Sequence, residues 1–209
     1  MTDSNFISDL KNEQFLGLYL DEVIYPKVFC EKSKLFERIH DKTLQKKGVD
    51  IIYHDSLKSW NIDEKAQLDY LNGNLPTFAF EISYMLNGQH KKGWLFDEEK
   101  ETEAYFLITK IQVQKNTIQS GIKSLSLTSI HRHKLIQYLN SVGLTKKRID
   151  EYESVMRGQK GDKKKIALDE LNKFKEGNMQ ISLFKHEQPI NIILKLDFLE
   201  KKGIAKKLL

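Results

Sequence analysis

The feature that most constrains the fold is a series of consecutive strand patterns between residues 49 and 111. Short extended segments rich in apolar residues occupy residues 49–53, 60–70, 77–85, 93–96 and 104–111. Asn, Gly and Asp residues typical of turns separate them. Because no helical pattern interrupts this series, the sequence predicts an antiparallel or mixed sheet rather than a doubly wound parallel one.

Helical patterns lie on both sides of the strand region. Before it, apolar residues at helical spacing occupy residues 13–23, which Pro26 is expected to end, and a second helix is expected from Ser33 to Gly48. After residue 120, we expect helices at 130–142, 146–156 and 165–175, strands at 179–184 and 190–194, and a helical tail at 198–209. The expected fold class is α/β, with helices flanking a central mixed or antiparallel sheet.

Charge is distributed unevenly along the chain. Residues 1–120 hold 15 Lys and Arg against 19 Asp and Glu, whereas residues 121–209 hold 19 against 10. We therefore expect a core at residues 1–120 and a basic, mostly helical C-terminal part at residues 121–209 that packs on the core or completes it. A basic region beside an acidic one suits a nucleic-acid enzyme. A lysine-rich solvated surface would give the same pattern.

Several classes of protein are disfavoured by what the sequence lacks. The single cysteine, Cys30, cannot form an intramolecular disulfide, so a reducing, cytoplasmic location is expected. No apolar run approaches the roughly 18 residues of a membrane span, so no membrane partner is expected. A Gly-rich phosphate loop, a Gly-x-Ser-x-Gly turn and a Cys-x-x-Cys pair are also missing, which argues against a nucleotide-driven motor, an esterase and a redox enzyme.

Two neighbouring strand segments carry acids where a metal could bind. Asp50 follows Gly48-Val49 at one strand, and Asp63-Glu64-Lys65 lies on the next. Because alternate residues of a strand share a face, Asp63 and Lys65 should point one way and Glu64 the other. A hairpin could bring Asp50 within a few ångströms of Asp63, and two such carboxylates repel unless a cation lies between them. Oxygen ligands suit Mg²⁺ or Mn²⁺.

This pattern resembles the PD-(D/E)XK nuclease superfamily over residues 13–111. About a dozen residues separate Asp50 from Asp63-Glu64-Lys65, and Gln67 follows the lysine as in related nucleases. The resemblance implies a restriction-endonuclease-like fold, in which Asp50 and Asp63 bind the metal and act in catalysis together with Lys65 and Gln67.

The expected helix before the strands carries a further acid of this resemblance. Glu37 would contribute to the metal site from that helix, on one line with Asp41 and Gln45. The chain departs from the family pattern at Val49, where a proline is common, and at Glu64, which adjoins Asp63. Glu64 is therefore also a candidate metal ligand, and which of the two carboxylates faces the metal stays open.

The function that this resemblance implies is Mg²⁺-dependent endonuclease cleavage of DNA phosphodiester bonds, in restriction, in phage or mobile-element DNA processing, or in repair. Two alternatives stay open: a non-catalytic nucleic-acid-binding or assembly protein that kept the fold, and a nuclease directed at RNA. Asp63-Glu64-Lys65 could also be an exposed charged strand edge. A homodimer would suit a nuclease that cuts both strands of a duplex.

Three weaker groups complete the candidates. His131 and His133 are two residues apart and do not share a helix face, so they suit a phosphate contact or a solvated helix start better than a metal. Lysines at residues 163–165 and in the tail after residue 200 could touch a phosphate backbone or face water.

Overall fold

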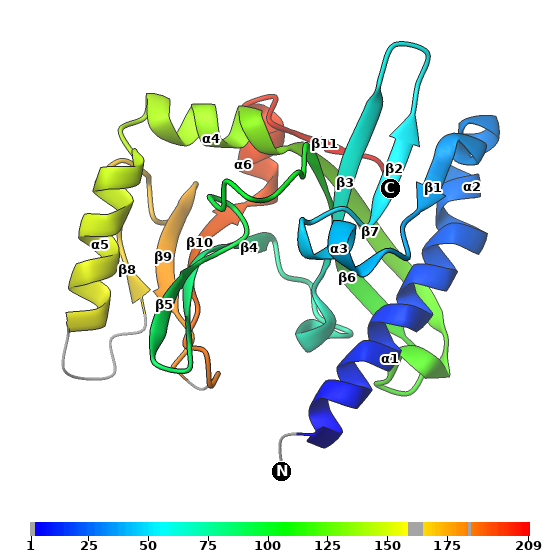
Figure 1. Ribbon diagram of the computed structural model, residues 1–209, viewed down its shortest axis with the longest axis horizontal. Coiled ribbons are helices and arrows are strands. Elements are labelled where there is room, and N and C mark those ends of the chain that lie inside the picture. Colours follow the sequence, from blue (N-terminus) through cyan, green and yellow to red (C-terminus); the bar gives the residue numbers. More distant parts are fainter. Residues whose placement is uncertain (1–2, 159–164, 184) are drawn as a thin grey trace. The chain divides into compact units, whose positions relative to one another are not determined.

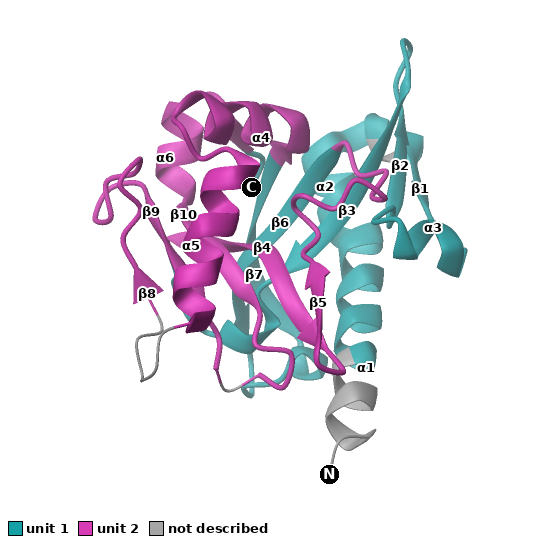
Figure 2. Ribbon diagram, turned by 60° about the vertical axis from the view of Figure 1, so that its left-hand side comes forward, with its two compact units in different colours: residues 1–75, 104–129, 207–209 teal, residues 76–103, 130–206 magenta. Residues whose placement is uncertain are grey.

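A computed structural model describes residues 3–158, 165–183 and 185–209, and the chain forms two compact units (Figures 1 and 2). Unit 1 comprises residues 1–75, 104–129 and 207–209, and unit 2 comprises residues 76–103 and 130–206. This division differs from the expected boundary at residue 120. The reason is that the chain leaves unit 1 after residue 75 and returns at residue 104 to extend its sheet.

A six-stranded sheet forms the centre of unit 1, and its last strand includes residues 205 and 206, which are counted with unit 2. Its strands lie in the order β1 (Phe36–Arg38), β2 (Ile51–His54), β3 (Ser59–Ala66), β6 (Ala104–Val113), β7 (Ile122–His131) and β11 (Ala205–Lys207). Strands β1, β2 and β3 are antiparallel neighbours, whereas β3 and β6 run parallel. The expected mixed sheet is therefore confirmed. Short 3₁₀ turns, η3 (Leu68–Tyr70) and η4 (Ile118–Ser120), follow β3 and β6.

A continuous helical segment precedes this sheet. It consists of α1 (Asp3–Tyr19), a π-helical turn η1 (Leu20–Ile24), α2 (Tyr25–Phe29) and a 3₁₀ turn η2 (Cys30–Leu35). The expectation that Pro26 ends the helix was wrong. Pro26 lies at the start of α2, directly after the π-helical turn, and the chain stays helical to Phe29.

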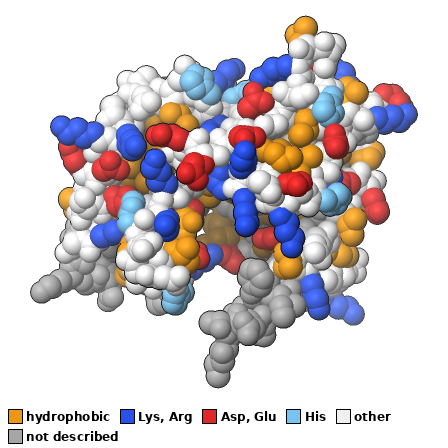
Figure 3. All heavy atoms as spheres, in the orientation of Figure 1, with side chains coloured by type: hydrophobic (Ala, Val, Ile, Leu, Met, Phe, Trp, Pro, Cys, Tyr) orange, Lys and Arg blue, Asp and Glu red, His pale blue; other side chains and the backbone are white. Residues whose placement is uncertain are grey.

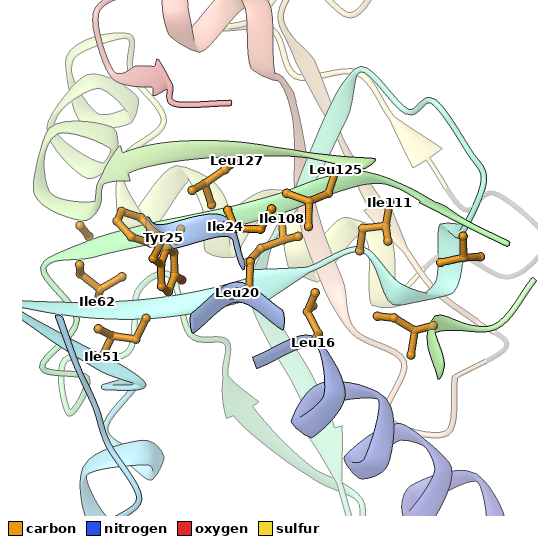
Figure 4. Packing of buried hydrophobic residues seen from close by; sticks show 14 residues of the cluster. Leu16, Leu20, Ile24, Tyr25, Ile51, Ile62, Ile108, Ile111, Leu125 and Leu127 are labelled. Carbon is orange, nitrogen blue, oxygen red and sulfur yellow. The ribbon is translucent and has the colours of Figure 1, made fainter. Parts of the chain in front are cut away.

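The core of unit 1 lies between this helical segment and one face of the sheet (Figure 4). Leu16, Leu20 and Ile24 are each at most 4% exposed and belong to the same buried cluster as Ile51 and Ile62. Burial of such aliphatic side chains stabilises a fold by about 1.5–3 kcal/mol each. The sheet face on which Ile62 lies is thus occupied by the core.

The helix expected from Ser33 to Gly48 was wrong. Phe36 stacks against Tyr25 and Tyr53, and residues 36–38 pair as strand β1 with β2. A short helix, α3 (Lys42–Lys46), begins only at Asp41, whose side chain accepts hydrogen bonds from the N–H groups of Thr43 and Leu44. The packing of Phe36 therefore favours a strand where the first part of the helix was expected. The Asp41 cap then starts a separate short helix.

The described part of unit 2 contains a five-stranded antiparallel sheet and three helices. Its strands lie in the order β5 (Gln89–Lys92), β4 (Thr77–Leu86), β10 (Ile190–Lys195), β9 (Gly177–Ile181) and β8 (Lys165–Ile166). Its helices are α4 (Arg132–Ser141), α5 (Lys146–Gly158) and α6 (Leu196–Lys201). The expected helices near residues 130–142 and 146–156 are confirmed, as is pairing of the strand near 179 with that near 190.

Other expectations after residue 90 were wrong. Residues 93–96 are not a strand, and a turn in which the Asn172 side chain accepts two backbone N–H groups replaces most of the helix expected at 165–175. Strand β7 was not expected, and the tail forms α6 followed by β11 rather than one helix. Lys163 and Lys164 lie outside the described residues. Within the described part of the chain, no helix is long and apolar enough to cross a membrane.

Candidate functional site

The hairpin of β2 and β3 brings Asp50 and Asp63 together. Ile51 pairs with Ile62, and the Asp50 backbone N–H donates to the Ile62 carbonyl at 2.9 Å, so the two aspartates follow one another across the strands. The negative charge of Asp63 acts on the Asp50 carboxyl, and Asp63 is only 2% exposed. The expected pairing of these two strands is therefore present, with the two aspartates on adjacent strands.

Lys65 belongs to the same group. Its Nζ atom lies 2.6 Å from Oδ1 of Asp63, and its side chain is 30% exposed. Oδ2 of Asp50 accepts a hydrogen bond from the Glu64 backbone N–H at 2.8 Å. Two carboxyls and one ammonium are therefore held on the sheet face opposite to that of Ile62, because Asp63 and Lys65 alternate with it along β3.

The environment of Asp50 disfavours its charge. Burial, followed by the negative charge of Asp63 and the hydrogen bond with it, raises the pKa of Asp50 to about 6, although Lys65 acts in the opposite direction. An acid in this state gains a proton or a cation more readily than an exposed aspartate. The pair of aspartates thus has the electrostatics of a cation-binding position.

Glu64 points to the other face of β3 and is held by a different set of groups. Arg38 donates from Nη1 to Oε2 at 2.7 Å and from Nη2 to Oε1 at 3.2 Å, and the Tyr25 hydroxyl donates to Oε1. Arg38 also binds Asp21 of the π-helical turn, at 2.5 Å and 2.8 Å. Burial raises the pKa of Glu64, and the hydrogen bonds from Arg38 and Tyr25 favour its charge. Both Glu64 oxygens therefore already have partners away from Asp50 and Asp63.

Glu37 lies elsewhere, and Gln67 follows the strand that carries Asp63 and Lys65. Glu37 is on strand β1, not on a helix, and its Oε2 lies 3.2 Å from Nε2 of the exposed His54. Strand pairing sets Glu37 opposite Ile52, two residues along β2 from Asp50. Gln67 follows the end of β3, and its backbone N–H donates to the Ile108 carbonyl at 3.0 Å. The structure thus does not group Glu37 with Asp50 and Asp63.

Asp41 and Gln45, which were expected to lie on the same side of a helix as Glu37, also make local contacts. The Asp41 side chain caps α3, and Nε2 of Gln45 donates to the Ile39 carbonyl at 2.9 Å. Among the described residues, no group of three or more His, Cys, Asp or Glu side chains is arranged to hold a metal ion. Asp50 and Asp63 are a pair, so water or a substrate would have to supply the remaining ligands of an ion between them.

The sequence analysis missed three residues that fix the position of β3: Asp21, Tyr25 and Arg38. It also missed Thr109, whose buried hydroxyl has no hydrogen-bond partner among the described residues. Thr109 lies two residues after Leu107, the β6 partner of Lys65, and so shares the sheet face of Lys65.

Comparisons with protein-family models, with curated proteins and with solved structures found no match to this chain. Function is therefore inferred from the site residues themselves.

Asp50→Asn is expected to stabilise the metal-free protein at pH 8 by about 1–2 kcal/mol, since an ionised Asp50 is disfavoured by burial and by Asp63. A folded-state pKa of about 6, above the unfolded value of 3.8, makes the folded chain bind more protons. Stability of the wild type should therefore fall as pH rises from about 4 to 6. Urea unfolding in EDTA at pH 4.5 and pH 8 measures both effects.

Asp55→Asn is the matched control. Hydrogen bonds from the backbone N–H groups of Lys58 and Leu57 lower the pKa of Asp55, so its charge is favoured and its removal should bring no stabilisation at pH 8. A lower stability of Asp50→Asn than of the wild type at pH 8 would show that Asp50 acts as an ordinary structural partner.

Proposed function

We propose that unit 1 is a metal-dependent nuclease that hydrolyses DNA phosphodiester bonds, and that it is related to the PD-(D/E)XK superfamily. The observation that carries the proposal is the placement of Asp50 and Asp63 on adjacent strands of one hairpin, with Lys65 at 2.6 Å from Asp63. Two acids and a lysine on one face of a mixed sheet are the groups that this chemistry requires. Restriction, phage or mobile-element DNA processing and repair are roles that such an enzyme would serve, in the cytoplasm.

Asp50 and Asp63 would hold Mg²⁺ or Mn²⁺, since these ions take oxygen ligands and keep several waters. The raised pKa of Asp50 fits a position that accepts a hydrated cation. When bound, the ion would polarise the scissile phosphate and lower the pKa of a water molecule. Glu64 and Glu37 are left out of the proposed ligand set, because Arg38 and His54 bind them.

Lys65 would act on the phosphate. Its ammonium is held by Asp63 and is partly exposed, so it can reach a substrate oxygen without losing its fixed position. A fixed positive charge stabilises the negative charge that develops on the phosphoryl oxygens in the transition state. Gln67, which follows Lys65 by two residues, is proposed to contact the same substrate group.

The test is incubation of the purified protein with supercoiled plasmid, single-stranded DNA and RNA, each with Mg²⁺, Mn²⁺ or EDTA. Cutting of DNA with metal and none in EDTA is the expected result. Linear rather than nicked plasmid as the first product would indicate that a homodimer cuts both strands. Cutting of RNA alone would replace the proposal by an RNA-directed nuclease, and nucleic-acid binding without cutting would replace it by a non-catalytic binding protein.

A second readout does not depend on activity. Mg²⁺ that binds between Asp50 and Asp63 should raise the melting temperature of the wild type progressively as its concentration rises above the dissociation constant, and should not raise that of Asp63→Asn. Equal shifts in both proteins would place the ion elsewhere.

A further inference from the structure

Unit 2 contains a cavity of about 400 Å³ between α5 and the hairpin of β4 and β5. Its apolar lining comes from Ile82 of β4, from Ile149 of α5 and from Phe96, which follows β5. Ile82 and Ile149 are buried, whereas Phe96 is half-buried. This volume lies within the range of about 300–1,000 Å³ that small-molecule sites occupy.

Hydrogen bonds hold the polar side chains at one part of the cavity. Oε1 of Glu153 accepts from the Ser83 hydroxyl at 2.5 Å and from Nε of Arg157 at 2.9 Å, and it lies 2.6 Å from Nε2 of His90. Arg157 also donates from Nη2 to Ser83 at 2.8 Å. Glu153 is only 6% exposed. These contacts join α5 to both strands of the hairpin, so the cavity wall is fixed before a ligand arrives.

Two lysines from separate elements converge at another part of the cavity. Nζ of Lys92, on β5, and Nζ of Lys146, at the start of α5, lie 3.8 Å and 3.7 Å from the same Oε1 atom of Glu98. All three side chains are largely exposed, at 47%, 62% and 77% respectively. Figure 3 shows basic, acidic and hydrophobic side chains side by side over the α5 and β5 region. An anion therefore already lies between two ammonium groups, on a side chain that is free to swing into water.

We propose that this cavity binds one nucleotide, with the base against Phe96 and the phosphate between Lys92 and Lys146. A phosphate carries more charge and more acceptor oxygens than the Glu98 carboxylate, so it would displace that carboxylate from the lysines. Inorganic phosphate alone would leave the apolar part unfilled, whereas an aromatic base gains contact with Phe96. The choice of a nucleotide among ring-bearing phosphates rests on the proposed nuclease function.

The test is isothermal titration calorimetry of the full chain in EDTA, so that the proposed metal site does not contribute. AMP should bind at one site, and adenosine and inorganic phosphate at least tenfold more weakly. Lys146→Ala should weaken AMP binding about tenfold, whereas Glu98→Ala should tighten it. Lys134→Ala, which removes an exposed lysine of α4, serves as the control and should bind AMP like the wild type.

Three results would overturn the proposal: no binding of AMP, equal binding of adenosine, or equal binding of phenyl phosphate. Tighter binding of a 5′-phosphorylated dinucleotide than of AMP would assign the cavity to the end of a nucleic-acid strand, and the reverse order would assign it to a free nucleotide. Lys65→Ala should bind AMP like the wild type. Failure of the nuclease proposal and failure of this one are thus separate results.

Discussion

Replacing Lys65 with alanine is expected to slow plasmid cleavage at least about 100-fold, with the fold retained. The Lys65 ammonium lies 2.6 Å from Asp63, and its removal takes away the fixed positive charge that would oppose charge growth on the phosphate. Because Asp63 is only 2% exposed, loss of Lys65 also leaves a buried carboxylate without its cation, so a lower melting temperature is expected beside the lost activity. Initial rates of supercoiled plasmid loss in Mg²⁺, beside the melting temperature of each protein, measure the effect.

Lys34→Ala is the control for this experiment. Lys34 is a lysine of the same unit whose side chain is 77% exposed and whose Nζ pairs with Glu31 at 2.8 Å. Its loss should change the cleavage rate less than twofold, since an exposed ion pair of this kind contributes little. Cleavage by Lys65→Ala at the wild-type rate would show that Lys65 takes no part in the chemistry. It would also contradict the proposed relation to the PD-(D/E)XK superfamily.

The candidate site could be predicted because it depends on short-range rules. Alternation along a strand put Asp63 and Lys65 on one face and Glu64 on the other, and the hydrogen bonds of Lys65 and Glu64 agree with this. The hairpin that joins Asp50 to Asp63 spans few residues, so its turn and register could be read locally. Strand alternation alone does not decide whether Asp63 or Glu64 would bind a metal. The ion pair of Glu64 with Arg38 is a physical reason to prefer Asp63.

Long-range packing decided what could not be predicted. Glu37 had a plausible place on a helix, but Phe36 stacks between Tyr25 and Tyr53, which are distant in sequence, and this packing makes residues 36–38 a strand. Arg38 binds Glu64, 26 residues later, through a contact that no local pattern encodes. The assignment of residues 76–103 to unit 2 could not be predicted either. It depends on the pairing of β4 with β10, which lies more than a hundred residues later in the sequence.

Arg38→Met is expected to lower the free energy of unfolding by about 3 kcal/mol, because removing one partner of a largely buried ion pair leaves the other charge uncompensated. Arg38 binds both Asp21 and Glu64, and the side chains of Arg38 and Glu64 are only 22% and 12% exposed. Methionine keeps much of the volume of the arginine, so the loss reports the charge and the hydrogen bonds rather than a cavity. Urea unfolding at pH 7 gives the measurement.

A double variant separates the charge effect from general damage to unit 1. Arg38→Met combined with Glu64→Gln should recover about 1–2 kcal/mol relative to Arg38→Met alone, because the neutral amide no longer leaves a buried charge without a partner. Lys34→Ala, which breaks the exposed pair with Glu31, should cost less than about 0.5 kcal/mol. If the double variant were no more stable than Arg38→Met, Glu64 would be indifferent to Arg38. The ion pair could then not be what holds Glu64 away from Asp50 and Asp63, and Glu64 would return to the candidate metal ligands.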